Sequence, residues 1–242
     1  MKNKKFRLYS IILIAAFFMI SITQVSFCEK NEEVFIKNGP RDKKYLAITF
    51  DDGPHPKETD EVLDVLKKHD VKATFFIAGK HANWYSKPLI RASKEGHEIG
   101  NHTFNHPDIS NLSNDQLEKE ILKCEEIIVK MTGKKPTLFR PPYGSFKKEE
   151  LAKIAEKHGY KVVLWDHVDA KDWKNPGANN IANEIINNVE NGDIILLHDY
   201  ATNNTVEALD IFIPEMQKRG YKFVTVSVIM NKIKFNNKKI KN

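Results

Sequence analysis

Residues 45–77 read YLAITFDDGPHPKETDEVLDVLKKHDVKATFFI, and this stretch decides the fold class. An apolar run at 45–50 is followed by an amphipathic segment at 58–69 and by a second apolar run at 73–77. Short apolar runs predict strands, and apolar residues repeated at helical period predict a helix. A helix that alternates with strands in this way connects them in parallel, so the sequence predicts an α/β protein.

The alternation of strand and helix patterns continues to residue 226. Further apolar runs lie at residues 98–101, 138–140, 161–165, 194–198 and 222–226. Further amphipathic segments lie at residues 84–95, 114–131, 147–158, 178–190 and 204–218. Seven strands that alternate with helices predict a distorted (β/α) barrel of seven or eight units, similar to a TIM barrel; a doubly wound open sheet is the competing arrangement. Both folds place the active site at the carboxyl ends of the strands.

The first 28 residues have the pattern of an export segment. Basic residues between Lys2 and Arg7 precede an apolar run at 8–22, which is shorter than the roughly 20 residues that a transmembrane helix needs. We interpret residues 1–28 as a secretory signal peptide, with an N-terminal membrane anchor as the alternative. Both interpretations place the protein outside the cytoplasm, either secreted or attached to the outer face of the membrane.

The rest of the chain is expected to form one domain. Residues 29–43 are interpreted as a lead-in segment, residues 44–232 as the α/β domain, and residues 233–242 as a basic C-terminal tail. Four of the positive charges lie in residues 1–28, so removal of that segment lowers the formal net charge from +6 to +2. Such a weak charge argues against a nucleic-acid partner. No pattern indicates an obligate protein partner, and we expect a monomer.

Cys124 is the one cysteine that follows the export segment. It shares an apolar stripe of helical period with Leu117, Ile121 and Ile128. We therefore predict a buried core residue at this position instead of a nucleophile. A single cysteine also excludes a disulfide within the exported chain.

Reactive side chains follow the ends of two predicted strands. Asp51 and Asp52 come directly after the first strand, where they either belong to a turn or share a cation, because adjacent carboxylates repel each other. His102 and His106 follow the third strand with a spacing that lets both imidazoles face one metal. Pro107 disfavours helical geometry at His106, so the turn should be short or irregular. Two imidazoles and one carboxylate, with a position left for water, are typical of a catalytic zinc-type site.

Three further motifs follow later strands. RPPYG at 140–144 follows the fourth strand, and because neither proline has an N–H, Tyr143 offers the first backbone donor after that strand. This N–H is suited to bind an oxyanion. The simpler interpretation is that the two prolines only stiffen the loop. DAKDW at 169–173 follows the fifth strand. His198 closes the aliphatic sixth strand, where it is either a core histidine or a functional one.

Five motifs therefore occur in order at strand ends: TFDDGP (49–54), HTFNH (102–106), RPPYG (140–144), DAKDW (169–173) and LLHD (196–199). In order and spacing they resemble the motifs of the polysaccharide deacetylase family, the NodB-homology domain of carbohydrate esterase family 4. The resemblance covers roughly residues 44–230. It implies a distorted barrel of seven or eight βα units, which agrees with the number of predicted strands.

The resemblance also implies which residues hold the metal and take the first proton. Asp51 is implied as the general base, and Arg140 as its ion-pair partner. The implied metal ligands are Asp52, His102 and His106. One carboxylate and two imidazoles suit Zn²⁺, Co²⁺, Ni²⁺ or Mn²⁺, and we take one Zn²⁺ ion as the default cofactor.

The remaining implied roles concern the general acid and the substrate. His198 is implied as the general acid, oriented by a carboxylate of the fourth motif; we assign this role to Asp172 and keep Asp169 as the second candidate. The implied substrate-binding groups are the backbone N–H of Tyr143 at the oxyanion, Trp173 at the wall of the sugar groove, and Leu196 at the acetyl methyl group.

These features predict metal-dependent hydrolysis of N-acetyl groups from an N-acetylhexosamine polysaccharide, with release of acetate. Peptidoglycan is the favoured substrate and chitooligosaccharides are second, because an exported single domain meets the cell wall first. The alternatives are an esterase that removes O-acetyl groups from xylan and a non-catalytic glycan-binding protein. The presence of both Asp51 and His198 argues against the non-catalytic alternative.

Overall fold

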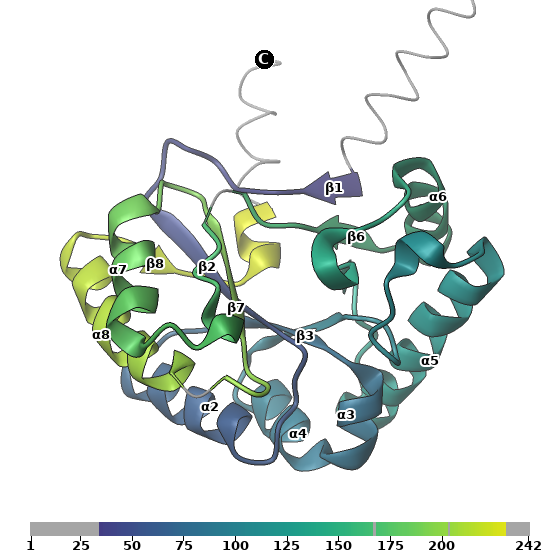
Figure 1. Cartoon of the computed structure of the whole chain (residues 1–242), viewed down its shortest axis with the longest axis horizontal. Helices are drawn as coiled ribbons and strands as arrows, with labels where there is room; N and C mark the ends of the chain where they lie inside the picture. Colours follow the sequence, from purple (N-terminus) through teal and green to yellow (C-terminus); the bar gives the residue numbers. More distant parts are fainter. Residues whose placement is uncertain (1–33, 167, 203, 231–242) are drawn as a thin grey trace, which may run out of the picture.

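The computed structural model describes residues 34–166, 168–202 and 204–230 (Figure 1). The predicted export segment at 1–28 and the predicted basic tail at 233–242 lie outside these residues. Within the described ranges, no helix combines the length and the apolar character needed to cross a membrane.

A parallel sheet forms the centre of the fold. Its strands are β1 Phe35–Ile36, β2 Tyr45–Asp51, β3 Thr74–Ile77, β4 Glu98–Asn101, β5 Leu138–Phe139, β6 Lys161–Val163, β7 Ile194–His198 and β8 Lys222–Phe223. The strand order is β1-β6-β5-β4-β3-β2-β7, and β8 pairs with the first residues of β2. All of these strand pairs are parallel. The seven predicted strands are confirmed as β2 to β8.

Helices connect the strands and lie around the outside of the curved sheet (Figure 1). They are α2 Glu58–Lys68, α3 Gly79–Trp84, α4 Ser86–Lys94, α5 Asn114–Thr132, α6 Lys148–His158, α7 Ala178–Asn188 and α8 Thr205–Lys218. The helix expected at 84–95 is α4, Ser86–Lys94. An additional short helix, α3, precedes it and ends before Tyr85, whose φ of −130° and ψ of 64° are not helical.

The sheet curls into a distorted barrel whose edge strands are β1 and β7. Two isolated bridges close the gap between these edges: Asn38, after β1, pairs with Asp193, before β7, and Asp169, after β6, pairs with Leu196 of β7. Arg41 reinforces the first bridge, because its guanidinium forms an ion pair with Asp193. The barrel prediction is confirmed, and the doubly wound open sheet is excluded.

The domain begins before residue 44, which corrects the expected lead-in at 29–43. Phe35–Ile36 of β1 pair with Val162–Val163 of β6, and Val34 is buried in the core. A strand of two residues is too short to show a hydrophobic period, so the sequence pattern could not reveal it.

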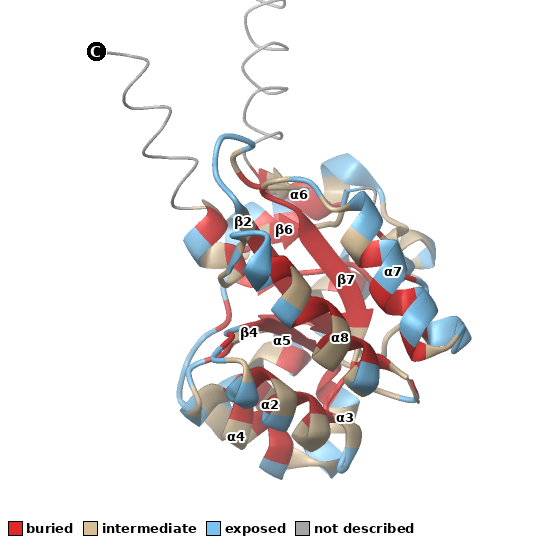
Figure 2. Cartoon of the chain, turned by 90° about the vertical axis from the view of Figure 1, so that its left-hand side faces the viewer, coloured by how far each residue is buried: buried red, intermediate tan, exposed pale blue. Residues whose placement is uncertain are grey.

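Buried side chains lie on both faces of the sheet, one set packed against the helices and another, which includes Ala47, packed with Val226 and Ile229. Figure 2 shows that the strands are largely buried, whereas each helix buries one side and exposes the other. Cys124 on α5 is fully buried, and its thiol donates to the carbonyl oxygen of Ile77 at 3.2 Å. Burial raises the pKa of this thiol to about 12. The prediction of an unreactive core cysteine is confirmed, because the thiolate is the reactive form.

Candidate metal centre and active site

The predicted site residues meet at the carboxyl edge of the sheet. Because all strands are parallel, the residues that follow β2, β4, β5, β6 and β7 emerge on the same side. A pocket of about 650 Å³ opens there, and its walls combine acidic, imidazole and aromatic groups. The residues that line it are Asp51, Asp52, His102, His106, Pro141, Tyr143, Trp165, Asp169, Trp173, Leu196 and His198.

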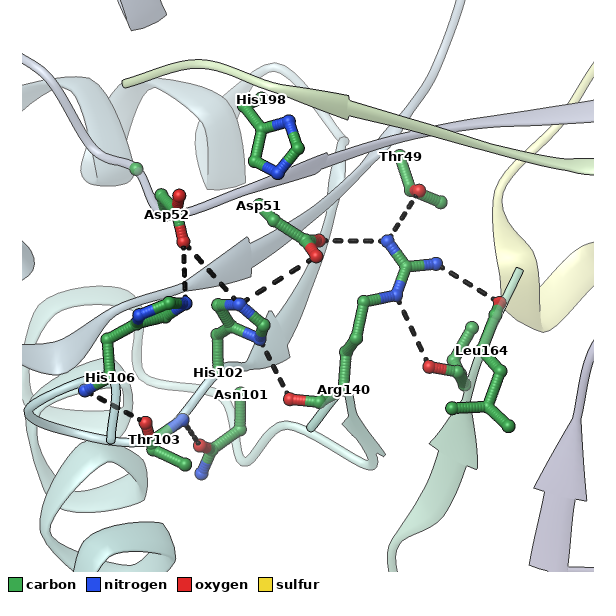
Figure 3. Close-up of polar contacts among 12 residues, drawn as sticks. Thr49, Asp51, Asp52, Asn101, His102, Thr103, His106, Arg140, Leu164 and His198 are labelled. Atoms are coloured by element: carbon green, nitrogen blue, oxygen red, sulfur yellow. Dashed lines mark hydrogen bonds and ion pairs between the residues drawn. The ribbon is translucent and has the colours of Figure 1, made fainter. Parts of the chain in front are cut away.

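Three of these side chains form a possible metal site. Oδ1 of Asp52 lies 3.1 Å from Nε2 of His106 and 3.5 Å from Nε2 of His102 (Figure 3). One ligand atom from each of the three residues lies within 4.8 Å of the others. Nδ1 of His102 donates to the carbonyl oxygen of Arg140 at 2.8 Å, which leaves Nε2 facing Asp52. This donor set fits a divalent transition metal.

The two histidines are placed by an irregular turn. Thr103 and His106 have positive φ values of 66° and 58°, so the segment after β4 is not helical. Side chains hold it: Asn101 Oδ1 accepts from the Thr103 N–H at 2.9 Å, and Thr103 Oγ1 accepts from the His106 N–H at 3.1 Å. The irregular turn predicted from Pro107 is confirmed, and both imidazoles still reach Asp52.

The charge state of Asp52 follows from its surroundings. Burial alone would raise its pKa, but the hydrogen bonds and positive charge of His102 and His106 outweigh this effect and lower the pKa well below the usual value. Asp52 is therefore ionised at neutral pH, as a metal ligand must be.

Asp51 forms a buried ion pair with Arg140. Arg140 is fully buried, and its Nη1 donates to Asp51 Oδ1 at 2.8 Å and to Thr49 Oγ1 at 2.7 Å. Its Nε and Nη2 donate to the carbonyl oxygens of Val163 and Leu164, which ties the guanidinium to the end of β6. These four bonds fix the plane of the guanidinium, and thereby the direction of the Asp51 carboxylate (Figure 3).

His198 contacts Asp172 and not the second candidate, Asp169. Nδ1 of His198 lies 2.7 Å from Asp172 Oδ1, and Asp172 Oδ2 accepts from the His198 N–H at 2.8 Å and from Thr205 Oγ1 at 2.7 Å. Asp169 instead accepts from the N–H of Lys171 at 3.0 Å. Burial would lower the pKa of His198, but Asp172 and the charges of Asp51 and Asp52 raise it to about 9. The ring is therefore cationic at neutral pH.

The remaining predicted residues form the walls of the pocket. The Tyr143 and Trp173 side chains are 68% and 54% exposed, so their rings are open to a ligand, whereas Leu196 is buried. The turn at Tyr143 has a positive φ of 59°, and its ring packs edge-on against His106 at 4.7 Å between centroids.

The sequence analysis missed several residues at this site. Trp165 lines the pocket, and Thr49 links Arg140 to the Ile195 carbonyl. Thr49 could have been found, since it belongs to the TFDDGP motif. Asp199 belongs to the LLHD motif and could have been found in the same way, whereas no sequence pattern indicates the contact of His81 with the Asp52 carbonyl.

Comparisons with known proteins agree with this geometry. The family model described as polysaccharide deacetylase matches residues 38–163. The peptidoglycan-N-acetylglucosamine deacetylase of Bacillus cereus is 45% identical over 194 residues, which are 79% of this chain and 90% of that protein. The peptidoglycan-N-acetylmuramic acid deacetylase PdaC of Bacillus subtilis is 41% identical over 186 residues, which are 76% of this chain and 38% of that protein.

A solved structure is similar over most of the described fold. It is the Bc1960 peptidoglycan N-acetylglucosamine deacetylase, crystallised with a benzamide compound. Its TM-score to this chain is 0.80 at 37% sequence identity, and the match covers 84% of this chain and 95% of that one.

Proposed function

Because the chain belongs to the polysaccharide deacetylase family, we propose that it removes N-acetyl groups from the N-acetylhexosamines of peptidoglycan in a metal-dependent hydrolysis that releases acetate. The observation that carries this proposal is the convergence of Asp52, His102 and His106 in the same pocket as Asp51 and His198. The peptidoglycan substrate is supported by the names of the relatives in two Bacillus species.

The proposed metal ligands are Asp52, His102 and His106. Zn²⁺ is our first choice, and Co²⁺, Ni²⁺ and Mn²⁺ suit the same donors. An ion held there supplies Lewis acidity to the acetyl carbonyl and lowers the pKa of water towards about 7.

Asp51 is proposed as the general base. Its Oδ1 is engaged by Arg140, whereas Oδ2 lies 3.7 Å from His102 Nε2 on the pocket side. Oδ2 can therefore accept the proton of the attacking water while Arg140 holds the carboxylate in one direction. A positioned base of this kind contributes about 10²–10⁴-fold to the rate.

The backbone N–H of Tyr143 is proposed to stabilise the oxyanion that forms on the acetyl group. The other N–H groups of this turn, those of Gly144 and Ser145, donate to the Pro141 and Pro142 carbonyls. One donor at an oxyanion typically contributes about 2.7–4 kcal/mol. Leu196 would contact the acetyl methyl group, and the exposed ring of Trp173 would pack against the sugar.

His198 is proposed as the general acid. An amine leaves the tetrahedral intermediate only after it is protonated, so the acid must carry a proton at working pH. Asp172 meets this requirement by binding Nδ1 and stabilising the cation, which leaves Nε2 available to donate.

The location and extent of the active protein are further parts of the proposal. Peptidoglycan lies outside the cytoplasm, so the predicted signal peptide or anchor at 1–28 would deliver the domain to its substrate. We propose that the domain extends from β1 to about residue 232 and acts as a monomer.

The test is acetate release by the full chain from three substrates: peptidoglycan, chitooligosaccharides and acetylated xylan. We expect peptidoglycan to be preferred, release to stop with a chelator, and activity to return with added Zn²⁺.

Asp51→Asn should keep the metal and lose about 10²–10⁴-fold in turnover, because only the base is removed. Acetate release that persists without any metal contradicts the mechanism. Preference for acetylated xylan indicates the esterase, and binding without release indicates the non-catalytic alternative.

A further inference from the structure

The peptide group between Asp52 and Gly53 is held by side chains at both of its polar atoms. The carbonyl oxygen of Asp52 accepts from Nδ1 of His81 at 2.7 Å. The N–H of Gly53 donates to Oδ1 of Asp199 at 3.1 Å. Neither His81 nor Asp199 is among the described residues that line the pocket, so their side chains reach the site through this peptide group.

His81 is fixed by an aromatic stack. It lies in α3, directly after β3, and its ring packs flat on the ring of Tyr200 with 3.9 Å between centroids and 1° between planes. Tyr200 follows β7, and the ring of His55 packs edge-on against the Tyr200 ring with 5.3 Å between centroids. Because a carbonyl oxygen can only accept, Nδ1 of His81 must carry the hydrogen of this bond.

Asp199 lies on the side of β2 opposite to His81 and is held in place by its own partners. It is buried, and its Oδ2 accepts from the hydroxyl of Thr59 at 2.6 Å. The approach to Gly53 is so close that a Cβ at this position would lie 2.3 Å from Asp199 Oδ1. Glycine is therefore required here, because any side chain would displace the carboxylate.

Asp52 needs such support because of its backbone conformation. Its φ of 74° lies in the left-handed region, which residues with a Cβ rarely adopt without local compensation. Fixing the plane of the following peptide fixes ψ of Asp52, and so the direction in which its carboxylate points. In the sheet order β3-β2-β7, His81 follows one neighbouring strand of β2 and Asp199 follows the other.

We propose that His81 and Asp199 are positioning residues that orient Asp52 for metal binding, with Tyr200 holding His81 in place. The inference rests on the proposed metal site. Both residues act on the backbone of a metal ligand, so they set metal affinity without touching the metal or the glycan. Partners of this kind typically change metal affinity or activity by 10–100-fold when they are removed.

The test measures Zn²⁺ binding to the metal-free full chain by equilibrium dialysis. His81→Ala and Asp199→Ala should each weaken Zn²⁺ affinity by about 10–100-fold, while the KM for peptidoglycan at saturating Zn²⁺ stays as in the wild type. Asp199→Asn should restore affinity, because the amide oxygen still accepts from Gly53. His69→Ala is the matched control, since His69 pairs with Asp210 at the other end of α2.

Tyr200 supplies a second test that removes no hydrogen bond to Asp52 or Gly53. Tyr200→Phe keeps the stack and should bind Zn²⁺ as the wild type does, whereas Tyr200→Ala should bind it more weakly. Wild-type affinity in His81→Ala, Asp199→Ala and Tyr200→Ala overturns the positioning proposal and leaves the metal site intact. Equal loss in Asp199→Asn and Asp199→Ala overturns the hydrogen-bond explanation. A wild-type chain that binds no Zn²⁺ overturns the metal site as well.

Discussion

At the scale of single residues, two neighbouring carboxylates of the site differ in the side chains that they contact. Asp51 and Asp52 are adjacent in the chain, yet Asp51 pairs with a buried guanidinium and Asp52 faces two imidazoles. In the proposed mechanism, Asp51 is thereby held for proton transfer and Asp52 for metal binding. A third carboxylate, Asp172, is proposed to act through His198 and does not need to face the pocket.

The role of Asp172 leads to a prediction about pH dependence. As the proposed general acid, His198 must be protonated, so kcat/KM should fall as the pH rises through its pKa, which is raised to about 9. Asp172→Asn removes the charge that raises this pKa while an acceptor for Nδ1 remains. In this variant, the decline of kcat/KM at alkaline pH should therefore begin at a pH lower by roughly 1–3 units. The measurement is the pH profile of acetate release at saturating Zn²⁺.

Asp169→Asn is the control for this experiment, because Asp169 also lines the pocket but bonds to the backbone of Lys171. In Asp169→Asn, kcat/KM should decline at the same alkaline pH as in the wild type. If Asp169→Asn shifts this decline and Asp172→Asn does not, the assignment of the orienting carboxylate must be reversed.

At the scale of elements, the accuracy of the sequence predictions depended on the length of each element. α5 was predicted at 114–131 and lies at Asn114–Thr132, because the capping box of Ser113 and Gln116 and the left-handed Gly133 mark its ends. β1 was missed because two residues carry no period. α3 was missed because its six residues are too few to show a helical period.

The five motifs were found for a related reason. Each is a continuous stretch of sequence at a strand end, so its residues can be recognised without knowing the fold. His81 lies outside the motifs and was missed because its partner is the backbone carbonyl of Asp52, and the sequence carries no signal for a contact across 29 positions.

The seam between β1 and β7 yields a prediction about stability. Arg41 spans it by pairing with buried Asp193 and with Asp166, the latter at 2.7 Å between Nη2 and Oδ2. Arg41→Ala should lower the free energy of unfolding by about 1–3 kcal/mol, because it removes hydrogen bonds to a buried carboxylate. Urea denaturation checks this value. Lys57→Ala, which breaks an exposed pair with Glu61, should cost about 0.5 kcal/mol or less. If both variants lost the same free energy of unfolding, the Arg41 contacts would stabilise the fold no more than an exposed ion pair does.

At the scale of the whole molecule, the parallel barrel explains why motifs spread from residue 49 to residue 199 form one site. Each motif follows a strand, and parallel strands bring their carboxyl ends to one edge. β2 lies between β3 and β7, ends at Asp51 and is followed directly by Asp52, so the segments after the two neighbouring strands can support this proposed metal ligand from either side. The proposed metal thus links residues that follow β2 and β4, which are separated by β3 in the sheet.

A ligand that links separate strand ends should stabilise the whole fold. The three ligands come together only in the folded chain, so Zn²⁺ binds the folded state in preference to the unfolded one. At free Zn²⁺ about 100 times its dissociation constant, the free energy of unfolding should rise by about 2.7 kcal/mol. For a domain of this size that corresponds to a rise in Tm of roughly 5–10 °C. Thermal denaturation with Zn²⁺ and with a chelator measures the difference.

His102→Ala should abolish this rise in Tm, because one imidazole and one carboxylate no longer hold the ion firmly, whereas His69→Ala should retain it. An equal rise in His102→Ala would place the bound ion elsewhere on the molecule.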